Sequence, residues 1–198
     1  MTHNSDLPRA DATRARLLDA AIEAFANKGF HGTTTRDIAA AAGMSPAALY
    51  VHHKSKEELL YLISRNGHED TLRLVRDAIA SSEVPVEALR QVIHDFAVYH
   101  AEGHTRARIV NYELAALTPE HYGEIREIRR DIEGELRQLV ERGVVSGAFD
   151  VPDTHLAGVA LLSLGIDIAR WYREGQLWSP EWIGESYAKI ALRIVGAD

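Results

Sequence analysis

The chain has 198 residues, 46% of them apolar, and a formal net charge of −7. This length and apolar content predict a globular protein of one or two domains and exclude a disordered chain. Because the sequence contains no cysteine, a disulfide framework and a thiolate zinc site are both excluded.

Neither the N-terminal segment nor the most apolar run indicates export or membrane insertion. Residues 1–14 lack the apolar stretch that a signal peptide needs. The run at residues 156–169 has 14 residues and contains Asp167, so it is too short and too polar to span a bilayer. We therefore expect a cytoplasmic protein with no membrane partner.

Apolar residues recur at helical spacing along the chain, and no alternating strand pattern appears between them. The sequence predicts an all-α fold with helices at residues 11–28, 35–42, 46–52, 56–80, 86–101, 104–117, 119–146, 153–174 and 180–195. A serine or threonine followed by proline marks three of the helix starts: Ser45-Pro46, Thr118-Pro119 and Ser179-Pro180. Two further starts have the spacing of a capping box, Ser55 with Glu58 and Thr34 with Asp37.

Residues 33–52, TTTRDIAAAAGMSPAALYVH, contain two short helical segments separated by a break. Gly43 allows the left-handed backbone conformation that ends the first segment, and Ser45 caps the second. Two short helices that cross steeply through a tight turn need small residues where they meet, and Ala39 and Ala42 are small. The spacing predicts a helix-turn-helix.

The side chains around this pair of helices suit a DNA duplex. Ala47 and Ala48 leave room for the second helix to approach base edges in the major groove, where alanine can touch a thymine methyl group. Arg36 is the long cationic side chain placed to reach a base. The other residues that we expect at the DNA, mostly at phosphates, are Thr34, Thr35, Ser45, Pro46, Tyr50, His52, Lys54 and Lys56.

The charge distribution agrees with a DNA partner, although the net charge does not. Residues 1–56 carry a formal charge of +2, whereas residues 57–198 carry −9. A small cationic head on an acidic body has this asymmetry. The spacing alone leaves one alternative open, an ordinary helical hairpin with a solvated basic loop.

Residues 14–60 resemble the N-terminal domain of TetR-family transcriptional regulators. The similarity is carried by FANKGFHGTT, TRDIAAAAGMSPAALY and HHKSKEELL, in that order. It implies an all-α homodimer with a three-helix DNA-binding head, residues 1–55, and a ligand-binding and dimerisation body, residues 56–198. The sequence departs from the family pattern after Tyr50, where His53 and Lys54 stand in place of an aromatic residue and its successor. We expect His53 to pack as a flat ring.

The body contains candidate residues for a small-molecule effector. The segment IARWYREGQLWSPEWIGESYAKIAL resembles the C-terminal end of relatives that control fatty-acid and steroid breakdown and sense acyl-CoA thioesters. An acyl-CoA needs cations for its phosphates and an aromatic ring for its adenine, and we expect Arg108, Tyr112, Arg170 and Trp171 to supply them, with Arg106 nearby. The alternative is that these arginines are surface ion-pair partners.

The helix predicted at residues 153–174 is apolar almost all the way round, so it must be covered on more than one side. Together with the helix at 180–195 from each of two chains, it would form a four-helix interface. The alternative is a core helix of a monomer.

Metal and enzyme readings find little support in the sequence. His100 and His104 are four residues apart, but Gly103 lies between them and no third ligand follows at short spacing. The sequence has no Gly-x-Ser-x-Gly elbow, no phosphate loop and no HExxH helix. A helical adaptor that binds only protein would leave Arg36 and the exposed alanines unexplained. We therefore predict no metal, no cofactor and no catalytic residue. The expected function is that of a ligand-responsive repressor that binds a palindromic operator as a dimer.

Overall fold

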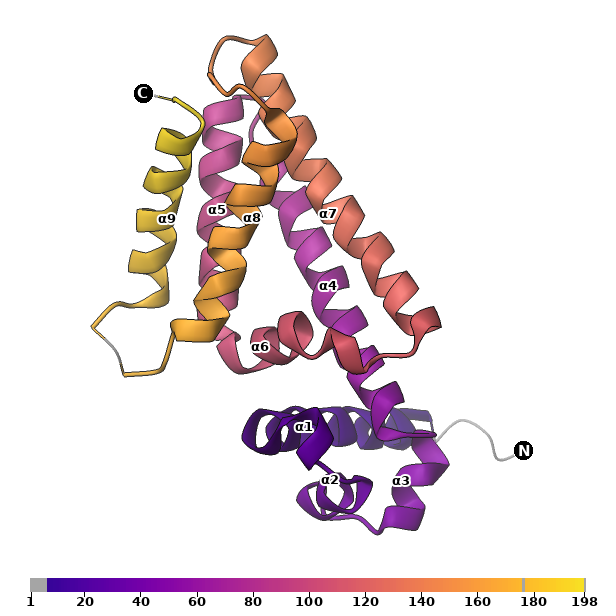
Figure 1. The fold of residues 1–198 in the computed structure, drawn as a ribbon. Helices are drawn as coiled ribbons and strands as arrows, with labels where there is room; N and C mark the ends of the chain where they lie inside the picture. Colours follow the sequence, from indigo (N-terminus) through magenta and orange to yellow (C-terminus); the bar gives the residue numbers. More distant parts are fainter. Residues whose placement is uncertain (1–6, 176, 198) are drawn as a thin grey trace. The chain divides into compact units, whose positions relative to one another are not determined.

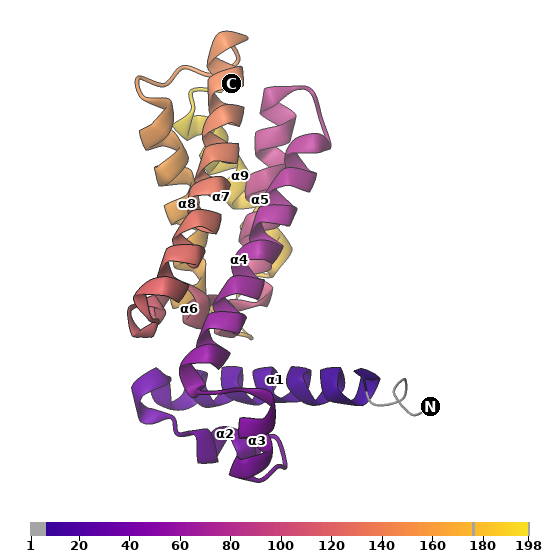
Figure 2. The same cartoon turned by 90° about the vertical axis from the view of Figure 1, so that its right-hand side faces the viewer.

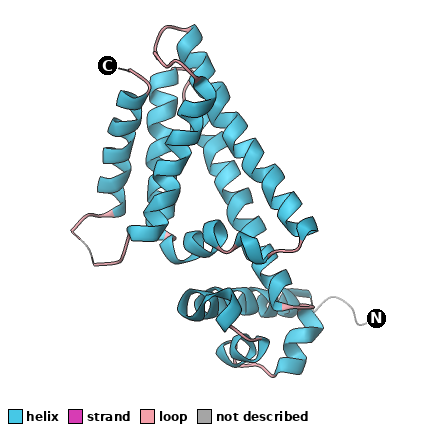
Figure 3. Ribbon diagram, viewed as in Figure 1, coloured by secondary structure: helices cyan, strands magenta, loops and turns pink. Residues whose placement is uncertain are grey.

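The computed structural model describes residues 7–175 and 177–197, and all regular structure in this part of the chain is helical (Figure 1, Figure 3). The all-α prediction is confirmed. The helices are α1 (Leu7–Gly32), α2 (Thr35–Ala41), α3 (Pro46–His52), α4 (Lys56–Ala80), α5 (Pro85–Glu102), α6 (His104–Tyr112), α7 (Pro119–Val145), α8 (Thr154–Trp171) and α9 (Pro180–Ile194), with a short 3-10 helix η1 (Leu114–Ala116).

Two predicted helices end three or more residues earlier than expected. The helix predicted to run to residue 117 stops at Tyr112, because Glu113 leaves the helical region with φ −100° and ψ 7°. The helix predicted to run to residue 174 stops at Trp171, because Tyr172 is extended and turns its ring into the core, where it is 6% exposed. Burial of that aromatic ring outweighs continuation of the helix.

The chain forms two compact units. Unit 1 comprises Met1–Asn66 and Arg108–Glu124, and unit 2 comprises Gly67–Ala107 and Ile125–Asp198. The boundaries between them fall inside α4, α6 and α7. The division that we predicted at residue 55 is a functional one and stays a prediction.

Unit 1 has one apolar core that joins α1, α2, α3 and the first turns of α4. Its centre consists of fully buried side chains, among them Leu17, Ile38, Leu49 and Leu60. Ala39 is also fully buried, as the predicted crossing of two short helices requires. Burial of this apolar surface is what stabilises helices of seven residues, which are too short to form alone.

Caps set the ends of the short helices as the sequence predicted. Thr34 and Asp37 form a reciprocal capping box at the start of α2, and the side chain of Ser45 accepts a hydrogen bond from the backbone N–H of Ala48 at the start of α3. Gly43 has φ 68°, the left-handed conformation that the turn between α2 and α3 needs.

The cap at the start of α4 differs from the predicted one. Ser55 accepts a hydrogen bond from the backbone N–H of Glu58, as a capping box requires. The Glu58 carboxylate, however, accepts from the backbone N–H of Lys54 and not from that of Ser55. The reciprocal bond therefore reaches one residue further back and ties the segment that follows α3 to α4.

Unit 2 is a bundle in which α5 packs against α9 and α8, while the second part of α4 lies beside α7 (Figure 1, Figure 2). Its largest core cluster includes Leu89, Phe96, Leu136 and Leu161, all nearly or fully buried. No helix of the described residues is both long and apolar enough to cross a bilayer.

Glycines permit close contacts between the helices of unit 2. A Cβ atom placed on Gly165 of α8 would lie 2.2 Å from Cδ1 of Phe96 on α5, and one placed on Gly184 of α9 would lie 2.8 Å from Val98. Real Cβ atoms do not approach that closely, so the absence of a side chain at these positions lets α8 and α9 pack directly on α5.

Candidate nucleic-acid interface

The start of α2 is held by a network around Asp37. The Asp37 carboxylate accepts hydrogen bonds from Nζ of Lys28 at 2.7 Å and from the backbone N–H of Thr34 at 2.8 Å. The bonds from Lys28 and Thr34 hold the pKa of Asp37 well below its usual range. The Thr34 side chain is thereby used inside unit 1, and it orients the turn that leads to Thr35 and the exposed Arg36.

A hydroxyl pair joins α2 to α3. The Thr35 and Tyr50 hydroxyl oxygens lie 3.1 Å apart, and Tyr50 is 54% exposed. Two hydroxyl groups that share one hydrogen bond at the surface keep further donor and acceptor capacity for a phosphate oxygen. The two residues that we predicted at phosphates are thus brought together from separate helices.

The outward face of α3 is apolar. Leu49 is fully buried, whereas Ala47 is exposed and Ala48 is half-buried. Val51, which the sequence analysis did not single out, is 79% exposed. Its spacing of four residues from Ala47 was the signal that could have placed both on one helical face.

The predicted cations differ in their surroundings. Arg36 and Lys54 are exposed and His52 is half-buried. Lys56 instead donates to the backbone carbonyls of Phe30, at 2.8 Å, and Thr33, at 2.9 Å, and its Nζ lies 4.4 Å from the centre of the Phe30 ring. The Lys56 ammonium group therefore holds the end of α1 in place.

His53 is buried in unit 1, as we expected of a flat ring at this position. It is 3% exposed, and its Nε2 has no hydrogen-bond partner among the described residues. Burial lowers the pKa of His53, so the neutral ring is favoured. His53 consequently adds packing and no charge to the segment that follows α3.

A second cluster in unit 1 ties α4 to the start of α7. Nδ1 of His121 lies 2.9 Å from Oε1 of Glu57, which also accepts the backbone N–H of Thr118 at 2.9 Å. The His121 ring stacks on Tyr61 at 3.9 Å between ring centroids, and the Tyr61 hydroxyl donates to Glu124. The sequence analysis missed this cluster, because its members are about 60 residues apart and carry no local pattern.

The predicted effector residues fall in both units. Arg108, half-buried on α6, and Tyr112, 48% exposed, belong to unit 1. Arg170 and Trp171 belong to unit 2. Arg170 is exposed and pairs with Asp167, with Nε 2.7 Å from Oδ1, which matches the alternative reading of a surface ion pair.

Trp171 takes part in an aromatic cluster at the junction of α8 and α9. Its ring lies edge-on to Tyr172 and Trp178, at 6.2 Å and 6.4 Å between centroids. Trp178 in turn stacks on Trp182 at 5.5 Å and 9°. Trp178 and Trp182 remain 44% and 50% exposed, so the cluster presents flat apolar surface to its surroundings.

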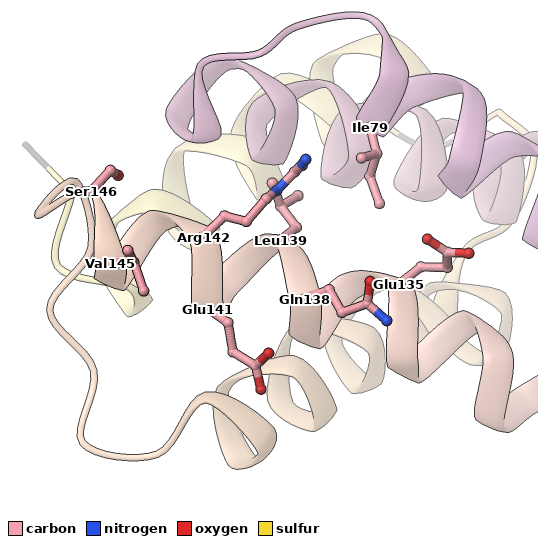
Figure 4. Close-up of a pocket in the computed structure, with 8 residues that line it drawn as sticks. All are labelled: Ile79, Glu135, Gln138, Leu139, Glu141, Arg142, Val145 and Ser146. Atoms are coloured by element: carbon pink, nitrogen blue, oxygen red, sulfur yellow. The ribbon is translucent and has the colours of Figure 1, made fainter.

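The described residues of unit 2 line at least two surface clefts. One, of about 480 Å³, lies between α4 and α7; there Ile79 points toward α7, while Leu139 and Arg142 point toward α4 (Figure 4). Another, of about 370 Å³, lies between α5 and α9 and is lined by Arg90, His94 and Lys189 among others. Neither cleft is lined by any of the four predicted effector residues.

The paired histidines of unit 2 bond to the backbone. Nδ1 of His100 lies 2.8 Å from the carbonyl oxygen of Phe96, and Nδ1 of His104 lies 3.1 Å from that of Ala101. Burial lowers the pKa of His100 to about 4. Within residues 7–175 and 177–197, no three His, Asp or Glu side chains gather in a way that could hold a metal ion.

Family models match most of the chain. The model described as bacterial regulatory proteins, tetR family, matches residues 17–61, and the model described as tetracyclin repressor-like, C-terminal domain, matches residues 82–195. The first match covers the helix-turn-helix, and the second covers most of the remainder.

Individual proteins agree with the family models. The transcriptional repressor KstR2 of Rhodococcus jostii RHA1 is 32% identical over 197 residues, covering 93% of this chain and 95% of the repressor. A structure of a tetR-family regulatory protein from Rhodococcus RHA1 superposes with a TM-score of 0.89 at 39% identity, over 94% of this chain and 98% of that one. AibR in complex with isovaleryl coenzyme A and operator DNA has a TM-score of 0.84 over 94% and 100% of the two chains, but its 22% identity concerns the fold alone.

Proposed function

Since the chain belongs to the TetR family of bacterial regulatory proteins, we propose that it is a ligand-responsive repressor that binds a palindromic operator as a homodimer and leaves it when a small molecule binds. Like its relatives, it is a DNA-binding transcriptional regulator and not an enzyme. Its proposed partner is double-stranded DNA, and its proposed location is the cytoplasm.

The arrangement of α2 and α3 carries the DNA part of the proposal. The side chains of α3 opposite the core, Ala47 and Val51, are short and uncharged, so the helix can lie close to base edges in a major groove. Tyr50, Thr35 and Lys54 stand at its edges, where phosphates pass, and Arg36 projects from α2 toward base edges. We retain Thr34, Ser45 and Lys56 as residues that position this surface.

Exposed apolar side chains on α8 and α9 support the homodimer. Val159 on α8 is 37% exposed, and Ile190 and Ile194 on α9 are 43% and 39% exposed. A line of this kind on two neighbouring helices is the expected half of a symmetric interface that two copies bury together. Two dimer-related heads would then reach successive half-sites of a palindrome.

The effector is proposed to be an acyl-CoA thioester. Arg108, Tyr112, Arg170 and Trp171 stay the proposed ligand residues, with cations for phosphates and an aromatic ring for adenine. AibR shows that a protein of this fold can bind both an acyl-CoA and operator DNA, and KstR2 of Mycobacterium tuberculosis is described as a ketosteroid transcriptional regulator. Release of DNA requires that the ligand binds the DNA-free form more tightly, and DNA must then weaken ligand binding by the same factor.

A duplex-binding assay with a salt titration tests the DNA part. The full chain is incubated with duplexes from a random pool, and affinity is measured between about 50 and 200 mM salt, where a regulator that contacts several phosphates loses orders of magnitude. Selection of a sequence with two inverted half-sites is the expected result. If no duplex is bound, or if affinity is insensitive to salt, the proposal is wrong.

A titration of the protein–DNA complex tests the effector part. Acyl-CoA thioesters and the matching free acids are added while fluorescence anisotropy of a labelled operator reports release. We expect thioesters to release the DNA and free acids to do so poorly. Release by free acids or by neutral apolar molecules, with none by thioesters, would show that the arginines are ordinary surface residues.

A further inference from the structure

We propose that Val51, with Ala47 one turn before it, contacts the 5-methyl groups of thymine bases. α3 would then recognise its DNA sequence through apolar contacts with methyl groups and not through hydrogen bonds to base edges. This inference rests on the proposed binding of duplex DNA and adds the base that the helix selects.

Ala47 and Val51 form the outermost line of α3. Successive residues of an α-helix are rotated by about 100°, so positions two before and two after Leu49 lie roughly 160° and 200° from it. Leu49 is fully buried in the core of unit 1, Ala47 is exposed, and Val51 is 79% exposed. The line directly opposite the core therefore consists of these two apolar side chains.

The polar groups of α3 stand beside this line, facing the phosphates in the proposed interface, or lie at the ends of the helix. The Tyr50 hydroxyl lies 3.1 Å from that of Thr35, and the Ser45 hydroxyl accepts the backbone N–H of Ala48. His52 is the last residue of the helix and is half-buried. Along the line opposite the core, α3 therefore presents only methyl groups to a base pair.

Thymine is the base that suits such a surface. In the major groove only thymine presents a methyl group among the four standard bases, next to its O4 acceptor. Contact between the thymine methyl group and a β-branched side chain removes apolar surface from water and stabilises the complex. One buried methyl group corresponds to about a fourfold increase in affinity. The occupant is duplex DNA because the apolar line is continuous with Tyr50 and Lys54, which face the phosphates in the proposed interface.

The test uses a duplex selected by the full chain from a random pool, in which each thymine is replaced in turn by uracil. Uracil lacks only the 5-methyl group, so base pairing and hydrogen bonding stay unchanged. We expect one or two positions in each half-site at which uracil weakens binding of the wild-type protein about fourfold. At those positions the Val51→Ala protein should bind the thymine and uracil duplexes almost equally.

Val84→Ala is the matched control. Val84 is 54% exposed and caps α5 in unit 2, so this variant should keep the full response to uracil. If uracil has no effect at any position, or if Val51→Ala retains the wild-type response, the inference is wrong while DNA binding stands. If the protein selects no duplex at all, the proposed function fails and the inference fails with it.

Discussion

The ammonium group of Lys56, at the start of α4, donates a hydrogen bond of 2.8 Å to the carbonyl oxygen of Phe30, at the end of α1. The same group also reaches the carbonyl of Thr33 and the face of the Phe30 ring. Gly29 beside it has φ 69°, so the helix is interrupted there and its carbonyls need partners from elsewhere. Lys56 supplies them, and this fixes the turn that leads into α2.

Replacement of Lys56 by methionine should destabilise the fold by about 1–3 kcal/mol, because two partly buried carbonyl groups lose their donor. Lys54→Met is the control: Lys54 is exposed, and its loss should change stability by less than about 0.5 kcal/mol. Urea denaturation of both variants measures the free energy of unfolding.

The same two variants separate an internal role of Lys56 from a phosphate contact. If Lys54 contacts a phosphate, Lys54→Met should lower the slope of log affinity against log salt by about one, and Lys56→Met should leave that slope unchanged. If Lys56→Met instead lowers the salt slope and leaves the free energy of unfolding unchanged, Lys56 contacts a phosphate and has no internal role.

Arg36→Ala should relax sequence preference. Arg36 is exposed near the start of α2, and an arginine that reaches a guanine contributes about 1–3 kcal/mol of discrimination. The ratio of affinities for the selected operator and a scrambled duplex should therefore fall roughly tenfold or more. Lys54→Met should weaken both duplexes alike, so an equal loss of preference in the two variants would contradict this division of roles.

Gly165→Ala should destabilise unit 2 by roughly 1–3 kcal/mol, since the new Cβ atom would lie 2.2 Å from Cδ1 of Phe96 and the ring would have to move. Gly134→Ala, on α7, is the opposite case. Apart from its chain neighbours and the nearby backbone of its own helix, no atom lies within 4 Å of a Cβ at Gly134, so the substitution should stabilise the helix by about 0.5–1 kcal/mol. Thermal denaturation of the pair should show midpoint shifts of opposite sign.

Ile190→Glu should convert the proposed dimer into folded monomers, because it would bury a charge without a partner at the interface. Ile190 is 43% exposed in the single chain, so the variant should still fold. Sedimentation velocity measures the change. Val145→Glu, at an 89% exposed position on α7, should leave the dimer intact, and dissociation of both variants would argue against an α8–α9 interface.

Stability should fall as the pH drops from about 6.5 to about 4. The pKa of His100 is lowered to about 4 by burial, so in this window the unfolded chain binds a proton that the folded chain does not. The loss is roughly 3 kcal/mol for this group, and the lowered pKa of His53 adds to it in the same direction.

Urea denaturation at several pH values measures this dependence. His100→Gln should reduce the slope between pH 4 and 6.5, whereas His31→Gln, at an exposed position, should not change it. An unchanged slope in His100→Gln would contradict the assignment.

The local features of the fold could be predicted from the sequence, because they depend on neighbours along the chain. The capping box of Thr34 and Asp37 and the turn at Gly43 follow from residues a few positions apart. The packing of His53 was expected from its place in the family pattern, and the ring is buried. The spacing of residues 33–52 predicted the helix-turn-helix, the family resemblance favoured it over an ordinary helical hairpin, and the family-model match at residues 17–61 agrees with it.

The long-range features could not be predicted in this way. Lys56 looked like a free cation, since nothing within its own helix indicates the carbonyls of Phe30 and Thr33. The early end of α8 likewise depends on where the Tyr172 ring is buried, which the spacing of apolar residues does not encode. Such contacts arise from tertiary packing, which overrides local preference.

The aromatic cluster at the junction of α8 and α9 makes the protein its own optical reporter. The chain has three tryptophans, and Trp171, Trp178 and Trp182 all lie there, two of them stacked and half-exposed. Tryptophan fluorescence, excited selectively over that of tyrosine, therefore comes entirely from unit 2, and the helices proposed to touch DNA contribute no tryptophan emission. A change in emission on adding an effector can be assigned to the surroundings of these three rings without any label.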